Sequence, residues 1–264
     1  MSKIKRLLLF IGFSLSLTCQ SQSFDIYTYH TDPPFLLNDQ TVDLSKAWIN
    51  HFNKQHTDIK LNLISIERPK LNKLIEAKQS YLILWANPIW FKSRDPNVLA
   101  SDPIFWDSDI WISRNTDKVT YSTPEDLIGL TIGGRKGYYY KGVNPLVKEG
   151  KIHRIDQNRD YANYEMLLKG AVKTFVMSRS SYLYWQSIGV NTQQLYTAMS
   201  AHDAFTRHVL ASQDRQSLLP VLNAFIQSIK ADTQWQSQLK GWGVDGLVNP
   251  YDIELDELDK LKLN

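Results

Sequence analysis

The stretch at residues 94–105 reads RDPNVLASDPIF, in which Arg94 stands seven residues before Ser101, the first residue of the turn Ser-Asp-Pro-Ile-Phe. On both sides of it, short apolar segments alternate with amphipathic segments of helical period. The expected strands are residues 24–29, 59–66, 81–85, 105–113, 130–132, 174–177 and 207–211. Helices are expected between them, one capped by Asp43 and one with Pro69 in its first turn. This alternation predicts an α/β protein with mostly parallel sheets.

Further motifs follow in a definite order along the chain. They are a Pro-Pro-Phe turn at residues 33–35, a Pro-Glu-Asp-Leu-x-Gly segment at 124–129, a strand at 174–177 shortly after Gly170, and a helix from Leu218 that leads to Gly-Trp-Gly at 241–243. Residues 133–137 read GGRKG and are expected to form a turn at the start of a helix. The free N–H groups of such a helix start suit an anionic group, although the stretch lacks the Gly-Lys-Ser/Thr ending of a phosphate loop.

In order and spacing, these motifs resemble the type II periplasmic solute-binding proteins. The particular family is the amino-acid-receptor-like one, bacterial extracellular solute-binding protein family 3. The resemblance implies two α/β lobes with a ligand cleft between them, joined by two crossover segments. The implied division is lobe 1 at residues 24–112 and 205–249, lobe 2 at residues 113–204, and a charged tail at residues 250–264. Proteins of this kind close on a ligand by hinge bending.

The N-terminal segment has the order of a secretory signal peptide. Three basic residues precede an apolar run of 11 residues at positions 7–17, and small or polar residues follow, so residues 1–23 are expected to be cleaved. The run is too short to cross a bilayer as a helix. A lipid-modified Cys19 is the less favoured alternative, because the residues before it depart from the usual lipoprotein pattern. The protein is therefore expected in the periplasm.

Charge excludes some classes of partner. Without residues 1–23 the chain has 27 basic and 27 acidic residues and no cysteine. A balanced charge gives no reason to expect a nucleic-acid partner or binding to an anionic membrane. A monomer that captures a small molecule is expected, and it would deliver the molecule to an inner-membrane ABC permease or to a sensor receptor.

The resemblance also implies a binding site. Arg94 would bind a ligand carboxylate, because a planar guanidinium donates two parallel hydrogen bonds to it; the alternative is a solvated surface charge. Ser178 stands where the family has the aspartate that pairs with an α-ammonium group, so a carboxylate-bearing or amphipathic ligand that stacks on aromatic rings fits at least as well as a standard amino acid. Asp32 is the nearby acid that could substitute. The predicted ligand-binding residues are Arg94, Asp32, Asn87, Trp90, Tyr138, Tyr139 and Ser178.

Enzyme classes find little support in the sequence. The six histidines show no metal-binding spacing, and there is no Gly-x-Ser-x-Gly motif, so no catalytic residue, metal or cofactor is expected. Two alternatives stay open. One is an enzyme on the same scaffold, a dehydratase-like lyase with His30 as acid–base. The other is a module that binds no ligand and serves protein interaction.

Overall fold

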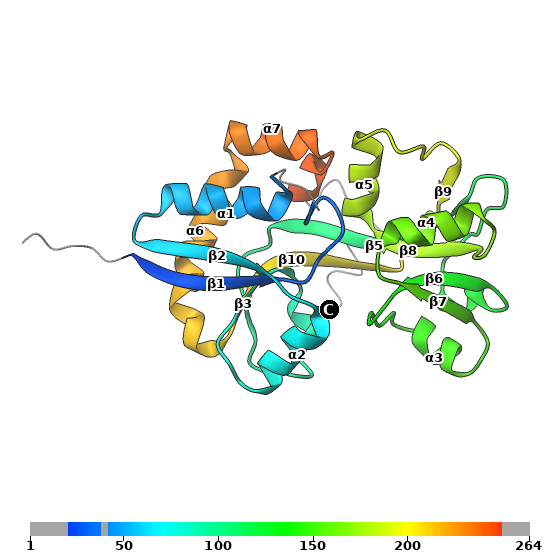
Figure 1. Ribbon diagram of the computed structural model, residues 1–264, viewed down its shortest axis with the longest axis horizontal. Helices are drawn as coiled ribbons and strands as arrows, with labels where there is room; N and C mark the ends of the chain where they lie inside the picture. Colours follow the sequence, from blue (N-terminus) through cyan, green and yellow to red (C-terminus); the bar gives the residue numbers. More distant parts are fainter. Residues whose placement is uncertain (1–20, 38–41, 250–264) are drawn as a thin grey trace, which may run out of the picture.

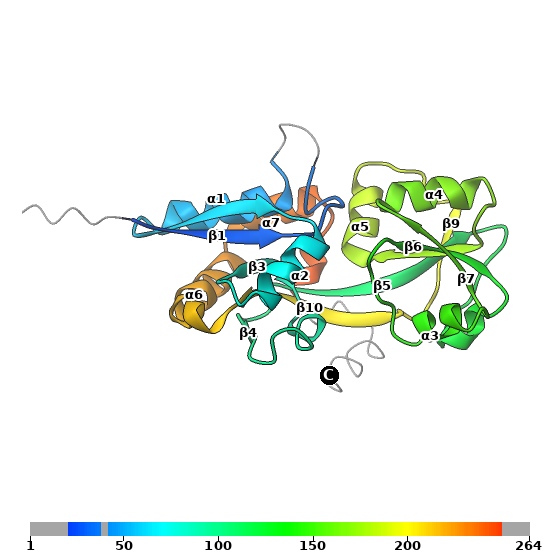
Figure 2. The same ribbon diagram turned by 60° about the horizontal axis from the view of Figure 1, so that its bottom comes forward.

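The computed structural model describes residues 21–37 and 42–249 of the 264-residue chain. The predicted signal peptide up to residue 20, with Cys19, and the tail at residues 250–264 lie outside the described residues. Two α/β lobes lie side by side, and two long strands run between them in both views (Figures 1 and 2).

The first lobe is built on a mixed sheet. Its strands are β1 (Gln22–Thr28), β2 (Ile59–Ser65), β3 (Leu82–Ala86), β4 (Leu99–Ala100) and β10 (Asp203–Ala211). The order is β2-β1-β3-β10, in which β1 is parallel to β2 and β3 and β10 is antiparallel to β3. Its helices are α1 (Leu44–Gln55), α2 (Arg68–Glu76), α6 (Leu219–Lys230) and α7 (Thr233–Gly241), with short 3-10 helices at Pro88–Trp90, Gln213–Leu218 and Asp245–Val248. In Figure 1, α1, α6 and α7 lie on the outer side of this lobe.

Helix α1 shows how local sequence and packing agree. The Asp43 side chain accepts a hydrogen bond from the Lys46 N–H at 2.7 Å and so caps the helix, as the sequence predicts. Leu44, Trp48 and Phe52 follow at intervals of four residues, which places them on one face of the helix. All three are buried in the core of the first lobe, where Trp48 and Phe52 pack against rings of α6 and β3.

The second lobe carries a smaller sheet. Its strands are β6 (Thr131–Arg135), β7 (His153–Gln157), β8 (Thr174–Ser178) and β9 (Leu195–Thr197), and its helices are α3 (Val143–Lys148), α4 (Asp160–Leu168) and α5 (Arg179–Ser187), with a 3-10 turn at Pro124–Leu127. The strand order continues from the first lobe as β10-β5-β8-β6-β7.

Strand β5 (Phe105–Arg114) passes from one lobe to the other. Its first half pairs antiparallel with β10, from Phe105 opposite Arg207 to Asp109 opposite Asp203. Its second half pairs antiparallel with β8, starting with Asp109 opposite Ser178. Phe105 packs in the first-lobe core and Ile112 in a second-lobe core, so the predicted boundary between residues 112 and 113 falls inside β5, on its second-lobe side.

The glycine-rich residues 133–137 do not form the predicted turn at a helix start. Gly133 and Gly134 lie within β6, and the next helix, α3, begins only at Val143. A Cβ atom on Gly133 would lie 2.6 Å from Asn163 Oδ1 and 2.8 Å from Phe175 Cβ. The glycine is therefore required for the close approach of α4 to the sheet, a contact between distant segments that the local sequence does not reveal.

This close approach gives a stability test. Gly133→Ala is expected to lower the free energy of unfolding by about 1–3 kcal/mol, since α4 must move to admit the methyl group. Gly241→Ala is the matched control, because Gly241 ends α7 and a Cβ there meets nothing within 4 Å; it should leave stability unchanged or raise it by up to about 1 kcal/mol. Urea titration followed by circular dichroism measures both, and equal midpoints for the two variants would contradict the packing argument.

Candidate functional site

A cleft of about 490 Å³ lies between the two lobes, a volume that suits a small organic ligand. Loops at the ends of β1 and β3 and the helix α2 contribute its first-lobe wall. The second-lobe wall comes from the segment after β6 and from the N-terminal ends of α4 and α5. The middle of β5 and the start of β10 line it where the chain crosses between lobes.

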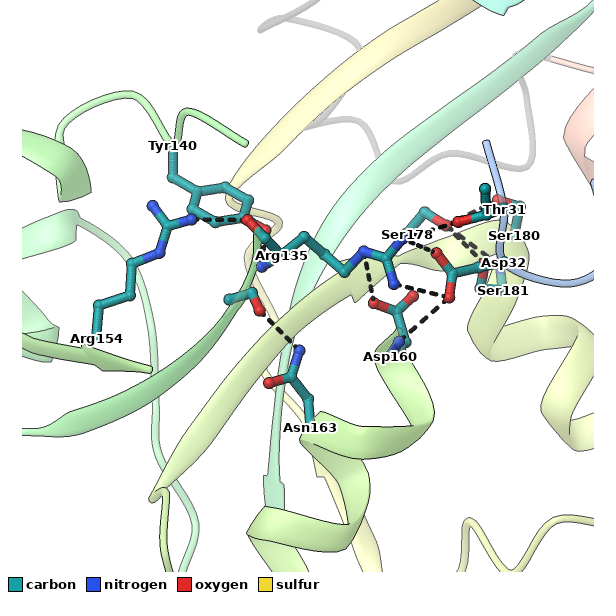
Figure 3. Close-up of polar contacts among 11 residues, drawn as sticks. Thr31, Asp32, Arg135, Tyr140, Arg154, Asp160, Asn163, Ser178, Ser180 and Ser181 are labelled. Atoms are coloured by element: carbon teal, nitrogen blue, oxygen red, sulfur yellow. Dashed lines mark hydrogen bonds and ion pairs between the residues drawn. The ribbon is translucent and has the colours of Figure 1, made fainter. Parts of the chain in front are cut away.

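An ion pair connects the lobes across this cleft (Figure 3). Arg135, at the end of β6, approaches Asp32 of the loop after β1 at 2.6 Å between Nη2 and Oδ2, and its Nη1 donates to Oδ1 at 3.0 Å. The backbone N–H of Asp160, at the start of α4, also donates to Asp32 Oδ1 at 3.2 Å. The geometry is bidentate and largely buried, which strengthens a charge-assisted hydrogen bond.

Asp160 competes with Asp32 for the same guanidinium. Its Oδ1 lies 3.8 Å from Arg135 Nε, beyond hydrogen-bond distance. Burial raises the pKa of the Asp32 carboxyl and raises the pKa of Asp160 well above its usual range, and the negative charge of Asp32 adds to the shift at Asp160. Two carboxylates therefore share one cation in this part of the cleft.

A second group of buried polar side chains joins the lobes near the crossing strands. Asp107 of β5 accepts hydrogen bonds from Arg207 Nε at 2.7 Å, from Ser180 Oγ at 2.7 Å and from Ser180 N–H at 3.0 Å. Arg207 Nη1 also lies 3.1 Å from the Trp85 carbonyl and 3.3 Å from His30 Nε2. The charges of Asp107 and Arg207 are thus compensated within the protein.

These surroundings determine the protonation state of the His30 imidazole. Burial and nearby guanidinium groups, Arg207 first among them, hold the pKa of His30 well below its usual range. The imidazole is therefore neutral, and its Nε2 accepts a hydrogen bond from Arg207. A neutral ring whose acceptor nitrogen faces a guanidinium is poorly suited to the acid–base role of the lyase alternative.

The structure brings six of the seven predicted binding residues to the cleft. The lining residues among them are Arg94, Asp32, Trp90, Tyr138, Tyr139 and Ser178. Asn87 is not among them: its Oδ1 accepts from the Ile89 N–H at 3.0 Å and its Nδ2 donates to the Thr206 carbonyl at 2.9 Å. Tyr139 is 71% exposed, which places it at the rim.

Two arginines line the first-lobe side of the cleft in different settings. Arg94 is exposed, and its Nε pairs with Glu76 Oε1 at 3.2 Å. Arg68, the first residue of α2, is half-buried; its guanidinium lies 4.0 Å from the Phe91 ring centroid and 4.7 Å from that of Tyr29. Its Nε donates to Asn72 Oδ1 at 3.0 Å and its Nη2 to the Trp90 carbonyl at 2.9 Å, but no carboxylate in the described part of the chain pairs with Arg68, so no ion pair neutralises its charge.

The sequence analysis missed Arg68 and also Asp109. Each carries a signal that could have been noticed. An arginine in the first turn of a helix is unfavourable with respect to the helix dipole. Asp109 lies in a strand whose neighbours are mostly apolar, FWDSDIWIS, where an acid is costly to bury. Burial raises the pKa of Asp109 to about 7, and the charges of Asp107 and Asp203 contribute to the shift.

The described residues contain neither a candidate metal site nor a candidate membrane-spanning helix. No group of three or more His, Cys, Asp or Glu side chains there could hold a metal ion. Across residues 21–37 and 42–249, no helix is long and apolar enough to cross a membrane.

Solved structures share this architecture. The GluR0 ligand-binding core from Nostoc punctiforme, in complex with L-glutamate, matches with a TM-score of 0.65 and 18% identity over 83% of this chain and 99% of its own. A mutant of ArgBP from T. maritima matches with a TM-score of 0.64 and 15% identity over 83% of this chain and 94% of its own. The substrate-binding protein of an amino acid ABC transporter matches with a TM-score of 0.61 and 15% identity over 83% of this chain and 98% of its own.

No protein-family model matches the sequence, and no curated protein matches it. The structural matches define the class of architecture: the chain has the two-lobed α/β fold of the periplasmic binding proteins, as the sequence resemblance predicts. The matched proteins named above are binding proteins and a ligand-binding core.

The ion pair between Asp32 and Arg135 gives a test of how the lobes are held. Asp32→Ala removes a buried partner of the guanidinium and should cost the closed arrangement about 1.5–3 kcal/mol, with Asp160 left as the remaining partner. Each 1.4 kcal/mol shifts an equilibrium between closed and open forms tenfold, so the radius of gyration from small-angle X-ray scattering should increase.

The control is Asp117→Ala. Asp117 pairs with Arg114 and Lys173 on the surface of one lobe, so its removal should leave the radius of gyration unchanged. If Asp32→Ala scatters like the wild type and like this control, the ion pair does not hold the lobes together.

Proposed function

We propose that the chain is a periplasmic solute-binding protein, which takes a small polar ligand into the cleft and holds it by closure of the two lobes. The observation that carries the proposal is a ligand-sized cleft between lobes whose walls present charged groups from both sides. Asp32 and Arg135 join the lobes at this cleft, so closure and ligand enclosure involve the same surfaces. The fold neighbours support a binding role by analogy.

The ligand carries a carboxylate, bound on the first-lobe wall. Arg68 supports this, because it lines the cleft and has no carboxylate partner among the described residues. Arg94, the anchor that the family resemblance implies, lines the same wall at its exposed rim and pairs with Glu76. Arg68 is the more buried of the two, so a carboxylate bound there gains a stronger interaction.

Aromatic side chains form the walls around the charged groups. Trp90 lies 4.9 Å from the Phe205 ring in an edge-to-face contact, and both residues line the cleft. Tyr138 faces them from the second lobe, with the Arg135 guanidinium 5.9 Å from its ring centroid. Rings on both sides favour a ligand with an apolar or planar part between its polar ends.

The proposed place of action is the periplasm, reached by the predicted signal peptide. The fold neighbours include both the substrate-binding protein of an amino acid ABC transporter and the GluR0 ligand-binding core. Delivery to a permease and presentation to a sensor therefore both fit this fold, with the chain acting as a monomer. The lyase and the interaction module are the outcomes against which the binding role is tested.

A thermal-shift screen of the purified protein against amino acids, organic acids, sugars, amines and peptides tests the binding role. A ligand at a hundredfold excess over its Kd stabilises by about 2.7 kcal/mol, which raises the Tm of a chain this size by roughly 5–10 °C. For a carboxylate-bearing hit, Arg68→Ala should weaken binding at least tenfold. Lys92→Ala is the matched control, because Lys92 is exposed in the same first-lobe region and does not line the cleft.

Three outcomes would contradict the proposal. A folded protein that responds to no class of compound would favour the interaction module. Consumption of a hit that stops in His30→Ala would favour the lyase. A carboxylate hit that binds Arg68→Ala and Arg94→Ala as tightly as the wild type would remove the proposed anion site.

A further inference from the structure

A row of polar residues crosses the floor of the cleft on three neighbouring strands. Asp109 of β5 is the register partner of Asp203 on β10 and of Ser178 on β8. Residues directly opposite one another in antiparallel strands place their side chains on the same face of the sheet. All three line the cleft, so this face is its floor at the point where the chain crosses between lobes.

No ion pair compensates the Asp109 carboxylate within the described residues, although the charge of Arg207 opposes the rise in its pKa that burial causes. The neighbouring acid on the same face, Asp107, has Arg207 and Ser180 as partners. For Asp109 the described residues show no ion pair and no side-chain hydrogen bond, and the residue directly opposite it is another acid, Asp203. A carboxylate removed from water without an ion-pair partner is destabilising.

Two other buried polar atoms at this floor also lack partners. Tyr29 is 5% exposed and lines the cleft, and its hydroxyl has no well-formed hydrogen bond among the described residues, although the nearby Arg68 guanidinium opposes the rise in its pKa that burial causes. Asp160 is likewise 5% exposed and lines the cleft, and its Oδ1 is buried without a hydrogen bond. Burial raises the pKa values of both residues and the charge of Asp109 adds to both shifts, which places the three groups near one another. Buried polar atoms without partners inside a cleft indicate that a ligand supplies the partner.

This part of the cleft has more carboxylates than cations that could pair with them. Asp32 and Asp160 share Arg135, and Arg207 is committed to Asp107, which leaves Asp109 without an ion-pair partner of its own. The tyrosine rings of Tyr29 and Tyr140 stand close enough to Asp109 for its charge to raise both pKa values. Carboxylates among electron-rich rings suit an organic cation, which gains both an ion pair and a cation–π contact.

We propose that Asp109 anchors a cation subsite on the floor of the cleft, which takes an ammonium or guanidinium group of the ligand with Tyr29 and Asp160 as further hydrogen-bond acceptors. This inference rests on the proposed function, that the cleft binds a solute. It adds a second ligand group to the carboxylate assigned to Arg68, so the ligand is an organic compound with a cationic end directed to the hinge strands. Ser178 lies beside this subsite, opposite Asp109, but it is uncharged and so cannot supply the negative charge that a bound cation needs.

The subsite couples binding to pH. Charged and titratable groups act on Asp109 or feel its charge from several neighbouring segments: Tyr29 after β1, Asp107 from β5, Tyr140 after β6, Asp160 from α4, and Asp203 and Arg207 from β10. Burial, with the charge of Asp107, raises the pKa of Asp109 to about 7. A bound cation favours the ionised carboxylate, so its affinity rises with pH through that value, by about tenfold between pH 6 and pH 8.

Isothermal titration calorimetry tests the inference. The probes are agmatine, putrescine, L-arginine and choline as cations, succinate and benzoate as carboxylates without a cation, and any hit of the thermal-shift screen. A cationic probe should bind the wild type more tightly at pH 8 than at pH 6. Asp109→Asn should weaken that binding by at least tenfold at pH 8 and flatten its pH dependence, whereas Asp109→Glu should retain part of both.

The controls separate this inference from the proposed function. Asp117→Asn, on the outside of the second lobe, should bind like the wild type. Asp109→Asn should keep the wild-type circular dichroism spectrum and an undiminished Tm without ligand, because it removes an uncompensated buried charge. If only compounds without a cation bind, or if a cation binds Asp109→Asn as tightly as the wild type, the subsite is wrong and the binding role stands. If nothing binds, both fail.

Discussion

The ion pair between Asp32 and Arg135 is the contact on which the arrangement of the cleft depends. It joins a loop of the first lobe to the last residue of a second-lobe strand, and the N-terminal end of α4 donates to the same carboxylate. The second tie, Asp107 with Arg207 and Ser180, lies at the crossing strands. One contact therefore closes the cleft across its walls and the other fixes the hinge side, so the space between them has a defined shape.

Buried charge is costly, and its distribution here separates structural groups from ligand-binding ones. Asp107 and Arg207 satisfy each other and belong to the scaffold. Arg68 on one wall and Asp109 on the floor have no such partner among the described residues, although each is at least half-buried. Proteins keep uncompensated groups of this kind where function requires them, because stability alone would remove them. The two groups have opposite charge, which suits a ligand with two unlike ends.

The sequence predicted the fold and most of its elements from local signals. Hydrophobic period, the Asp43 cap and Pro69 in the first turn of α2 are all properties of short segments, and the structure confirms them. The glycines at 133 and 134 were misassigned because distant side chains require them, Asn163 and Phe175 at Gly133 and Arg154 and Asp156 at Gly134. In the site, the resemblance predicted six residues that line the cleft, Asp32 among them. It could not show that Arg94 pairs with Glu76 or that Asp109 has no ion pair within the described residues, because pairing between distant side chains is a property of the folded chain.

The central claim is that a small organic ligand lies between the lobes with its anionic group at the first-lobe wall and its cationic group at the floor of the cleft. A crystal structure of the protein with a screened ligand tests it most directly. The account predicts ligand density between the Tyr29 and Tyr138 rings, an anionic group within hydrogen-bond distance of Arg68, and a cationic group within hydrogen-bond distance of Asp109, with the Asp32–Arg135 pair intact. A ligand bound outside the cleft, or one that touches a single lobe while the ion pair is broken, would contradict it.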